Sequence, residues 1–405
     1  MKKALRKIHL WLSVPTGIII TLVCFSGAML VFEKEITEAI KPELYFVKEA
    51  KGEPIPMQQL MEKVEETLPD SVSISGVTVF ADSTRTYQVS LSKPRRASIY
   101  VNQYTGEVTG RSERLPFFNT MFHLHRWLLG SSSGVGKPLT GICTLLLVFI
   151  LITGICTLVL VFILITGILM WLTNRNKPLK ASLAIHVTKG WGRFWHDLHV
   201  AGGIYTTIFL LAMALTGLTW SFSWYRTGFY ACFGVESSEK GGAHGEGGNS
   251  HGEGRGSRGE GRYSHGDGRN NHEGKRGEGR GFHRRSPYRH WDDVLNEVAL
   301  KNPGYQQITL KAEAAEVVPE GRLSLRATDK YSYNRRSGEI TDVKLYSSEG
   351  KDTKVRSGVY MVHTGSWGGI ITRILNFLAA LIGATLPLTG YWLWIRRLTR
   401  KRGKI

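Results

Sequence analysis

The sequence has little cysteine, and its cysteines are not arranged as a disulfide framework. Only four are present in 405 residues: Cys24, Cys143 and Cys156 lie in apolar runs, and Cys232 stands alone near a membrane edge. Cysteine in an apolar helix usually behaves as a small hydrophobic residue. A nucleotide-binding fingerprint is also missing, because the glycines at 190 and 192 follow no predicted strand. These absences argue against a disulfide-stapled scaffold and against an NAD(P)H site within the chain.

Charge is missing from residue 139 to residue 172, the most hydrophobic stretch of the chain. An apolar run of about 18 residues or more predicts a transmembrane helix. The stretch contains a tandem repeat, TGICTLLLVFILIT at 140–153 followed by TGICTLVLVFILIT at 153–166, with no polar turn between the copies. At about 1.5 Å per residue it would be roughly 51 Å long, against a hydrocarbon core of about 30 Å. We interpret it as one duplicated helix that must tilt, bend or protrude.

Positive charge is concentrated beside the apolar runs. The net charge of +19 includes three basic clusters, at residues 2–7, 175–193 and 396–404. The positive-inside rule places these clusters, and therefore both termini, in the cytoplasm. Membrane topology and headgroup contact explain the charge better than nucleic-acid binding does. The first apolar run is long and is followed by no A-x-A cleavage site, so we expect an uncleaved anchor that runs from the cytoplasm outward.

These signals predict an α-helical membrane protein with four transmembrane helices and two small α+β modules on the outer side. The predicted segments are transmembrane helices at 8–32, 138–172, 196–224 and 365–395, outer modules at 33–137 and 287–364, a cytoplasmic loop at 173–195, a Gly/His-rich disordered insert at 225–286 and a basic cytoplasmic tail at 396–405. Within the modules, helices are predicted at 57–68 and 290–300, and strands at 72–80, 87–91, 98–101, 307–311 and 322–327. The sequences YTGEVT and RSGEIT occupy the same place in both modules, which indicates an internal repeat.

Histidine marks the start of every predicted span. The candidates are His9 for the first span, His123 and His125 for the second, His196 and His199 for the third, and His363 for the fourth. Spans one and three start in the cytoplasm and spans two and four start outside, so the topology groups the histidines into two pairs at two depths. Ionisable residues at membrane depth are rare and suggest function, and neutral imidazoles are good axial ligands of haem. A single interfacial histidine is usually only an amphipathic residue, but four such starts favour two b-type haems.

Two details of these sites follow from the sequence. The spacing alone does not choose between His123 and His125, or between His196 and His199. Small residues near the histidines are predicted to let a flat macrocycle approach the backbone; they are the glycines at 17, 202, 203, 365, 368 and 369.

At these residues the chain resembles the PepSY-associated transmembrane family, iron-regulated inner-membrane proteins that include ferric-siderophore reductases. The matching pieces are KIHLWLSVPTG (7–17), HLHRWLLG (123–130), DLHVAGGIY (197–205), HTGSWGG (363–369) and the two modules ending in YTGEV and RSGEI. The resemblance implies a four-helix core that holds two b-type haems, with PepSY modules in the periplasm. The family's L-H-R and L-H-x-x-G patterns select His125 over His123 and His199 over His196. The duplication and the insert depart from the family pattern.

The resemblance also implies outward electron transfer, from quinol or another membrane donor to a ferric siderophore or other ferric chelate. Reduction would release the metal, because hard oxygen ligands hold Fe²⁺ less tightly than Fe³⁺. The predicted partners are therefore membrane lipid, a ferric chelate and a membrane electron donor, with no nucleic acid. The histidines of the insert suggest weak metal capture, although the interleaved arginines favour a plain tether. The alternative function is a membrane-anchored PepSY protein that binds or restrains a periplasmic peptidase without redox activity.

Overall fold

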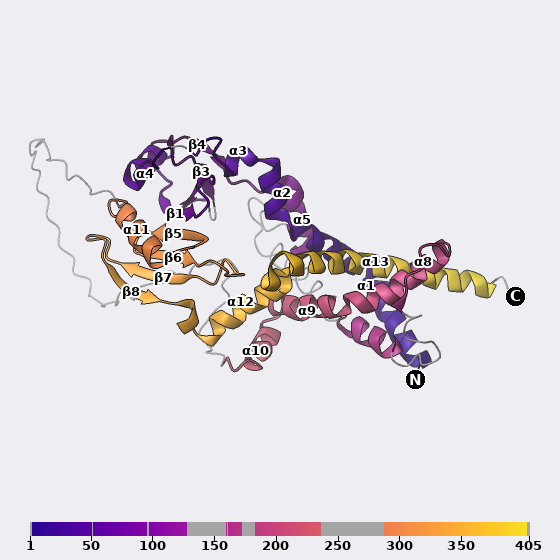
Figure 1. The fold of residues 1–405 in the computed structure, drawn as a ribbon. Coiled ribbons are helices and arrows are strands. Elements are labelled where there is room, and N and C mark those ends of the chain that lie inside the picture. The colour runs from indigo at the N-terminus through magenta and orange to yellow at the C-terminus, as the bar shows by residue number, and fades with distance from the viewer. Residues whose placement is uncertain are drawn as a thin grey trace, which may run out of the picture.

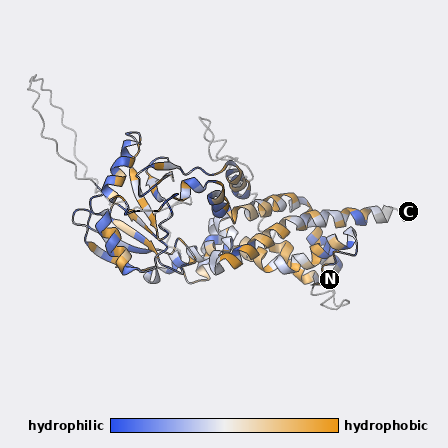
Figure 2. Ribbon diagram, turned by 45° about the horizontal axis from the view of Figure 1, so that its top comes forward, coloured by the Kyte–Doolittle hydropathy of each residue, from blue (hydrophilic) through white to orange (hydrophobic). Residues whose placement is uncertain are grey.

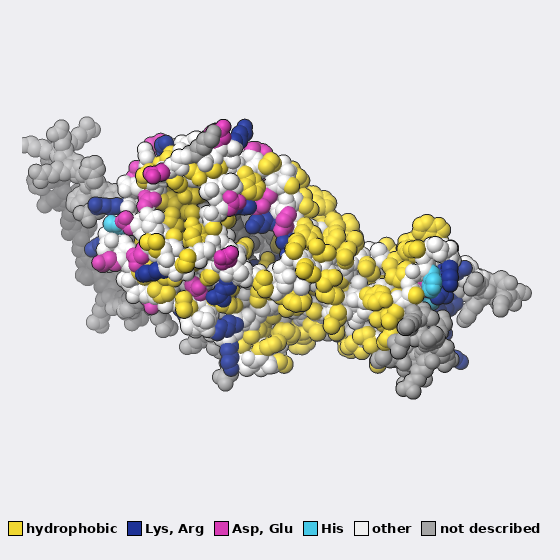
Figure 3. Space-filling model, in the orientation of Figure 1, with side chains coloured by type: hydrophobic (Ala, Val, Ile, Leu, Met, Phe, Trp, Pro, Cys, Tyr) yellow, Lys and Arg dark blue, Asp and Glu magenta, His cyan; other side chains and the backbone are white. Residues whose placement is uncertain are grey.

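A computed structural model describes residues 2–50, 52–94, 97–127, 159, 161–171, 183–235 and 287–402. They form a bundle of long helices and a head built on a β-sheet, with both chain ends at the end of the bundle farthest from the head (Figure 1). Apolar residues dominate the helices of the bundle (Figure 2). Charged side chains gather over the head, whereas hydrophobic side chains cover most of the visible bundle surface (Figure 3). The chain is therefore a membrane protein with a soluble α+β region.

Among the described residues, three helical segments are long and apolar enough to cross a membrane, Arg6–Leu30, Trp191–Ser221 and Ser366–Thr399. They lie in α1 (Lys2–Leu30), in α8 (Trp191–Asp197) with a π-helical turn (Leu198–Gly202) and α9 (Gly203–Ser221), and in a 3₁₀ turn (Ser366–Gly368) with α13 (Gly369–Arg402). Large apolar side chains point outward: Ile18, Ile208 and Ile371 are 63%, 71% and 68% exposed. Lipid rather than water explains such a surface.

The second predicted span is described only at its end. Residues 128–158, which hold most of the tandem repeat, lie outside the described residues, and the described end is an apolar helix, Val161–Trp171. The count of four spans therefore stays a prediction. A separate helix, α5 (Pro116–Trp127), carries His125 and packs against α1. It belongs to the bundle, although the predicted module runs to residue 137, because its apolar face buries Phe118 and Leu124.

Several other boundaries differ from those predicted. Helix α1 starts before residue 8 and α13 continues past residue 395, because long basic side chains let a helix extend into the headgroup region. The third span begins at Trp191, inside the predicted loop at 173–195, of which residues 173–182 lie outside the described residues. Helix α12 (Lys351–Thr364) lies within the predicted module at 287–364 but packs on α9 in the bundle. The insert is described only to residue 235, and its first residues form part of helix α10 (Ser223–Ala231).

The head contains one antiparallel sheet of eight strands in the order β4-β3-β2-β1-β5-β6-β7-β8. The strands are β1 (Ile74–Phe80), β2 (Tyr87–Leu91), β3 (Ser98–Val101), β4 (Val108–Arg111), β5 (Gln307–Lys311), β6 (Ala314–Val318), β7 (Asp329–Tyr333) and β8 (Ile340–Lys344). Helices α4 (Met57–Glu66) and α11 (Trp291–Lys301) cover the apolar residues that alternate along the strands. Leu60, Trp291 and Leu310 are fully buried in this core.

Two halves with the same order of elements build this sheet. Each half runs helix, four strands, helix: α4 through α5 in the first and α11 through α12 in the second. Their first strands, β1 and β5, pair antiparallel, with Val77 opposite Leu310 and a hydrogen bond of 2.9 Å between the hydroxyls of Thr78 and Thr309. The two predicted modules therefore share one continuous sheet rather than folding as separate bodies.

The strand predicted at 322–327 is wrong. This segment is a loop between β6 and β7, and its alternating apolar residues do not pair with a neighbouring strand. It packs instead against α12, where the Arg326 guanidinium lies 3.8 Å from the centre of the Tyr360 ring and the Ser324 hydroxyl meets that of Ser357. Contact with the bundle, which alternation along the sequence does not reveal, decides its structure.

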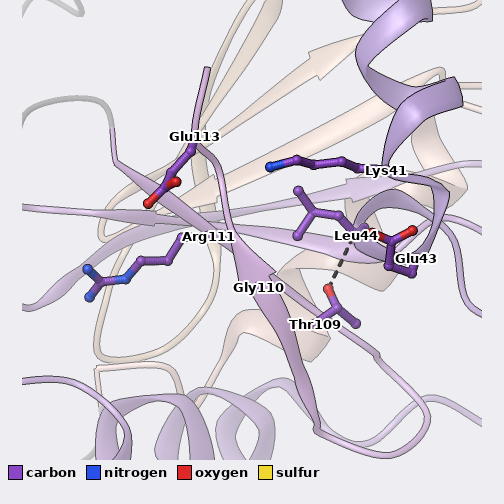
Figure 4. Close-up of a pocket in the computed structure, with 7 residues that line it drawn as sticks. All are labelled: Lys41, Glu43, Leu44, Thr109, Gly110, Arg111 and Glu113. Carbon is purple, nitrogen blue, oxygen red and sulfur yellow. Dashed lines mark hydrogen bonds between the residues drawn. The ribbon is translucent and has the colours of Figure 1, made fainter. Parts of the chain in front are cut away.

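The edge strand β4 is covered by α3 (Pro42–Tyr45), which follows α2 (Glu33–Ile40). Gly110 has a positive φ, and a Cβ there would lie 2.9 Å from Leu44 Cδ1. Beside this contact, the Thr109 hydroxyl donates to the Leu44 carbonyl across a small cavity (Figure 4). Two basic and two acidic side chains, Lys41, Arg111, Glu43 and Glu113, line the cavity, so it has no excess of either charge.

Candidate functional site

Four histidines meet in two pairs inside the bundle. His9 of α1 and His199 of the π-helical turn have ring centroids 6.4 Å apart, with ring planes at 89°. His125 of α5 and His363 of α12 have centroids 6.1 Å apart, with planes at 54°. We call the first the far pair, because it lies toward the chain ends, and the second the head-side pair. These are the pairings expected from the sequence, and each pair takes one histidine from each half of the chain.

Each ring is held through Nδ1 by a backbone carbonyl of a neighbouring helix. In the far pair, His9 Nδ1 donates to Ile163 O at 3.2 Å and His199 Nδ1 to Leu386 O at 3.1 Å. In the head-side pair, His125 Nδ1 donates to Val23 O and His363 Nδ1 to Met213 O, both at 2.9 Å. A carbonyl can only accept, so Nδ1 carries the proton and the lone pair of Nε2 remains for a metal. Metal-ligating histidines are usually oriented in this way.

A glycine lies against each ring, four residues after the carbonyl that the ring contacts. Built at these glycines, a Cβ would lie 2.8 Å (Gly27), 3.2 Å (Gly217), 3.3 Å (Gly390) and 3.7 Å (Gly167) from the Cε1 of the adjacent histidine. The residue before each glycine is serine or threonine, and its hydroxyl donates back to the same carbonyl. We call each such unit, a carbonyl followed by x-x-[ST]-G, a hydroxyl–glycine step.

The hydroxyl–glycine steps were missed from the sequence, although a signal for them exists. The dipeptide Ser-Gly or Thr-Gly occurs in each of the four apolar runs, as FSG, ITG, LTG and LTG ending at residues 27, 167, 217 and 390. His9 precedes Gly27 by 18 positions, and His199 precedes Gly217 by 18 positions. Eighteen residues are about five α-helical turns and about 27 Å, so α1 presents a histidine and a glycine on one face at two depths. In the third span, His199 lies in the π-helical turn and Gly217 lies in α9.

The glycines proposed from the sequence contact other groups. A Cβ at Gly17 would meet the Tyr391 hydroxyl, one at Gly202 would meet Ile382, and one at Gly365 would meet Asn376. Gly203 faces Leu386 and Gly368 faces Thr372, and a Cβ at Gly369 would meet no atom within 4 Å. These glycines either allow helices to pack closely or lie where the helix is interrupted between α12 and α13. The contact with a macrocycle predicted for these glycines stays a prediction, whereas the glycines that contact the histidine rings lie on the opposing helices.

The two weaker candidates, His123 and His196, lie outside the pairs. His123 packs edge-to-face on Phe122, and on α5 it is His125 that meets His363. His196 Nδ1 lies 3.3 Å from the buried carboxylate of Asp197, which also accepts from His186 at 2.7 Å and Arg193 at 2.9 Å. This cluster ties the segment before α8 to the start of the third span. It fixes the backbone just ahead of the π-helical turn that carries His199, and such turns are frequent at functional sites.

The geometry of both pairs fits an iron held by two imidazoles. Two rings that share one metal through Nε2, with metal–nitrogen bonds of about 2 Å, have centroids about 6 Å apart. The observed separations are 6.4 Å and 6.1 Å. The donor set is two neutral nitrogens with the opposite ring nitrogen already hydrogen-bonded, and the surroundings are apolar helices. The residues present therefore fit bis-imidazole b-type haem at both levels.

The comparisons with known proteins agree with a two-part membrane architecture. The family model described as PepSY-associated TM region matches residues 6–158 and 150–397. The two matches overlap within the tandem repeat. No curated protein matches the chain. Since the matched segments cover nearly all of its length, the chain belongs to the PepSY-associated TM region family.

Proposed function

We propose that the protein is a di-haem b electron-transfer protein of the bacterial inner membrane that reduces a ferric siderophore, or another ferric chelate, in the periplasm. The observation that carries the proposal is the meeting of all four span-start histidines in two pairs at ring separations of 6.4 Å and 6.1 Å. Four interfacial histidines without a shared role would not be expected to form two pairs with nearly the same separation between ring centroids. A membrane-anchored adaptor without redox activity would not need these contacts.

The residues of the chain have three tasks in this proposal. His9 and His199 would hold one haem, and His125 and His363 the other. A haem held by two of these imidazoles would supply one-electron chemistry. The carbonyls of the hydroxyl–glycine steps orient each imidazole, fix the proton on Nδ1 and make Nε2 a more basic ligand. The surrounding apolar helices keep the two levels dry.

The direction of transfer follows from the distribution of charge. Both ends of the chain are basic, with Arg6 and Lys7 in α1 and Arg396 to Arg402 in α13. The positive-inside rule puts these ends in the cytoplasm and the head in the periplasm. The far pair then lies on the side of a membrane donor such as quinol, and the head-side pair lies next to the chelate. Reduction to Fe²⁺ weakens binding by hard oxygen ligands and frees the metal.

The test is the haem content of the purified full-length protein. We expect two b-type haems per chain by pyridine haemochrome, with a dithionite-reduced α-band. His199→Ala and His363→Ala should each lose about one haem, because each removes one ligand of one pair. His290→Ala is the matched control, since His290 lies on the head and contacts Asp293. A wild-type protein without haem, or loss of haem in the control, would overturn the proposal; with haem present, stopped-flow mixing of reduced protein with a ferric chelate tests the substrate.

A further inference from the structure

Helix α10 has an unusual position and surface. It starts two residues after α9 ends, where Phe222 adopts an extended conformation and turns the chain away from the span. In Figure 1 it lies beside the ends of α9 and α12 that are nearest the head. None of its residues is buried. A helix this short would not stand in water on its own, because a few turns without a buried face are only marginally stable.

The side chains of α10 and its flanks are mainly aromatic, small or uncharged. Trp224 is 64% exposed and Phe233, just past the end of the helix, is 55% exposed. The rings of Tyr225, Phe229 and Phe233 follow one another at a spacing of four residues, with centroids 5.8 Å and 5.3 Å apart. The helix contains one basic residue, Arg226, and no acidic residue. Exposed aromatic rings at the end of a span are typical of the membrane–water interface.

Basic side chains stand next to this aromatic surface. Helix α12 begins with an exposed lysine and continues with Lys354 and Arg356, also exposed. A Cβ at Gly234, beyond the end of α10, would lie 3.4 Å from the Lys351 ammonium, so the two helices adjoin at this point. Figure 3 shows dark-blue basic side chains at the lower edge of the molecule. Aromatic rings that can lie at the acyl-chain boundary therefore adjoin basic side chains that can bind lipid phosphate.

We propose that α10 and the first turns of α12 form an interfacial anchor that binds anionic phospholipid in the leaflet facing the head. Two observations select lipid as the occupant. The surface directly follows the lipid-exposed span of α9. Its basic side chains, Arg226, Lys351, Lys354 and Arg356, outnumber its one acidic side chain, Asp352, and this positive excess complements anionic headgroups. The consequence reaches the candidate site, because α12 also carries His363. An anchor at Lys351 would fix the tilt of the helix that presents this ring. The proposal does not depend on haem being bound.

The experiment places a fluorophore on the anchor in the full-length protein. Cys232 is exposed at the end of α10, so a bimane maleimide can be attached there in a variant with Cys24, Cys143 and Cys156 replaced by alanine. The protein is reconstituted in nanodiscs of phosphatidylcholine with phosphatidylglycerol, with or without bromine on the acyl chains. We expect bromine to lower the bimane emission by about twofold, as it does for groups at the acyl boundary. The control is Leu300→Cys in a Cys232→Ala background, on α11 of the head, where the side chain is 83% exposed and bromine should have no effect.

Charge reversal then tests the basic part of the anchor. Lys351→Glu with Arg356→Glu should reduce the quenching at Cys232 in discs that contain phosphatidylglycerol and leave it unchanged in phosphatidylcholine alone. Equal quenching at positions 232 and 300 would overturn the proposal. The proposal would also be overturned if bromine did not change the bimane emission but the number of protein copies per disc did, because a second chain would then cover α10. Quenching that appears only after deletion of residues 236–286 would assign the surface to that segment instead.

Discussion

The far pair and the head-side pair are built from the same hydroxyl–glycine step but use it differently. In the far pair, each Nδ1 contacts a carbonyl at 3.2 Å or 3.1 Å and also a threonine hydroxyl, Thr166 at 3.1 Å for His9 and Thr389 at 2.9 Å for His199. In the head-side pair, both carbonyls are closer, at 2.9 Å, and His363 Nδ1 also contacts the Thr216 hydroxyl at 3.2 Å. His125 differs from the other three rings, because its Nδ1 contact among the described residues is with the Val23 carbonyl. The ring planes are perpendicular in the far pair and inclined by 54° in the other.

The difference is largest between His9 and His125. Gly167 leaves 3.7 Å between a built Cβ and the His9 ring, whereas Gly27 leaves 2.8 Å to the His125 ring. At Gly27 the preceding residue is Ser26, whose hydroxyl donates to Leu22 O at 2.6 Å. A ring pressed closely onto the helix reaches the carbonyl directly, and a ring held farther out shares its proton with a hydroxyl. The position of the His125 ring thus depends on the absence of a side chain at Gly27, and that of the His9 ring on the Thr166 hydroxyl.

The largest effect is expected from a methyl group at the tight step. Gly27→Ala would place a Cβ 2.8 Å from His125 Cε1 and 2.9 Å from its Nδ1, which forces the ring off its carbonyl. Overpacking of this kind costs about 1–3 kcal/mol, or about 5- to 150-fold in haem affinity. We expect purified Gly27→Ala to retain about one haem per chain by pyridine haemochrome.

The matched variant is Gly167→Ala at the loose step. Its Cβ would be in ordinary contact with the His9 ring at 3.7 Å, so the haem content should stay at the wild-type level. Equal losses in the two variants would remove the distinction between a tight and a loose step. Retention of both haems in Gly27→Ala would show that the His125 ring has room to move.

A smaller effect is expected from the hydroxyl at the far pair. Thr389→Val keeps the shape of the side chain but leaves His199 Nδ1 with the Leu386 carbonyl alone. A hydrogen bond accepted from Nδ1 makes the imidazole more basic and favours ferric iron, so its loss should raise the reduction potential of one haem. A bond worth about 0.5–1.5 kcal/mol corresponds to about 20–60 mV for one electron. A potentiometric titration of the α-band measures the shift.

Ser26→Ala provides the comparison for this variant. The Ser26 hydroxyl bonds within its own helix, to Leu22 and Val23, so its removal should leave both potentials unchanged. A shift in Ser26→Ala as large as that in Thr389→Val would mean that the hydroxyls act through the helices rather than through the rings.

Local patterns in the sequence predict much of the fold. Period-two alternation gives strands β2, β3 and β5 with their observed bounds, and the apolar runs give the three long helices. Topology alone groups His9 with His199 and His125 with His363, because the depth of a span start is set by the order of the spans. The sequence does not reveal the pairing of β1 with β5, which depends on contact between the halves. It also hides the carbonyl partners of the rings, since these lie more than a hundred residues away along the chain.

The smallest effect is expected at the salt bridge that joins α2 to α13 on the head side. Arg373 pairs with Glu35 and also donates to the Val31 carbonyl. The hydrogen bond that Glu35 accepts from Arg373 lowers the pKa of this carboxyl below its ordinary value of 4.5. A group with a lowered pKa in the folded state stabilises the fold fully above its unfolded pKa and loses this contribution as the pH falls through the folded pKa. The Glu35 side chain is 45% exposed, so the contribution is at most about 1 kcal/mol.

Haem binding at the head-side pair should therefore be the first to weaken in mild acid. Arg373 lies in the first turns of α13, just after the helix interruption that follows His363. We expect wild-type protein to lose haem at a lower temperature at pH 4 than at pH 6, measured from the Soret band during heating. Glu35→Gln should reduce this difference, and Glu62→Gln, on α4 in the head, should leave it as in the wild type. If Glu35→Gln keeps the full pH dependence, the acid-sensitive group belongs to another part of the molecule. His363→Ala should retain only the haem of the far pair, and His199→Ala only that of the head-side pair. If acid removes haem from His363→Ala but not from His199→Ala, the far pair is the weaker one and the comparison is reversed.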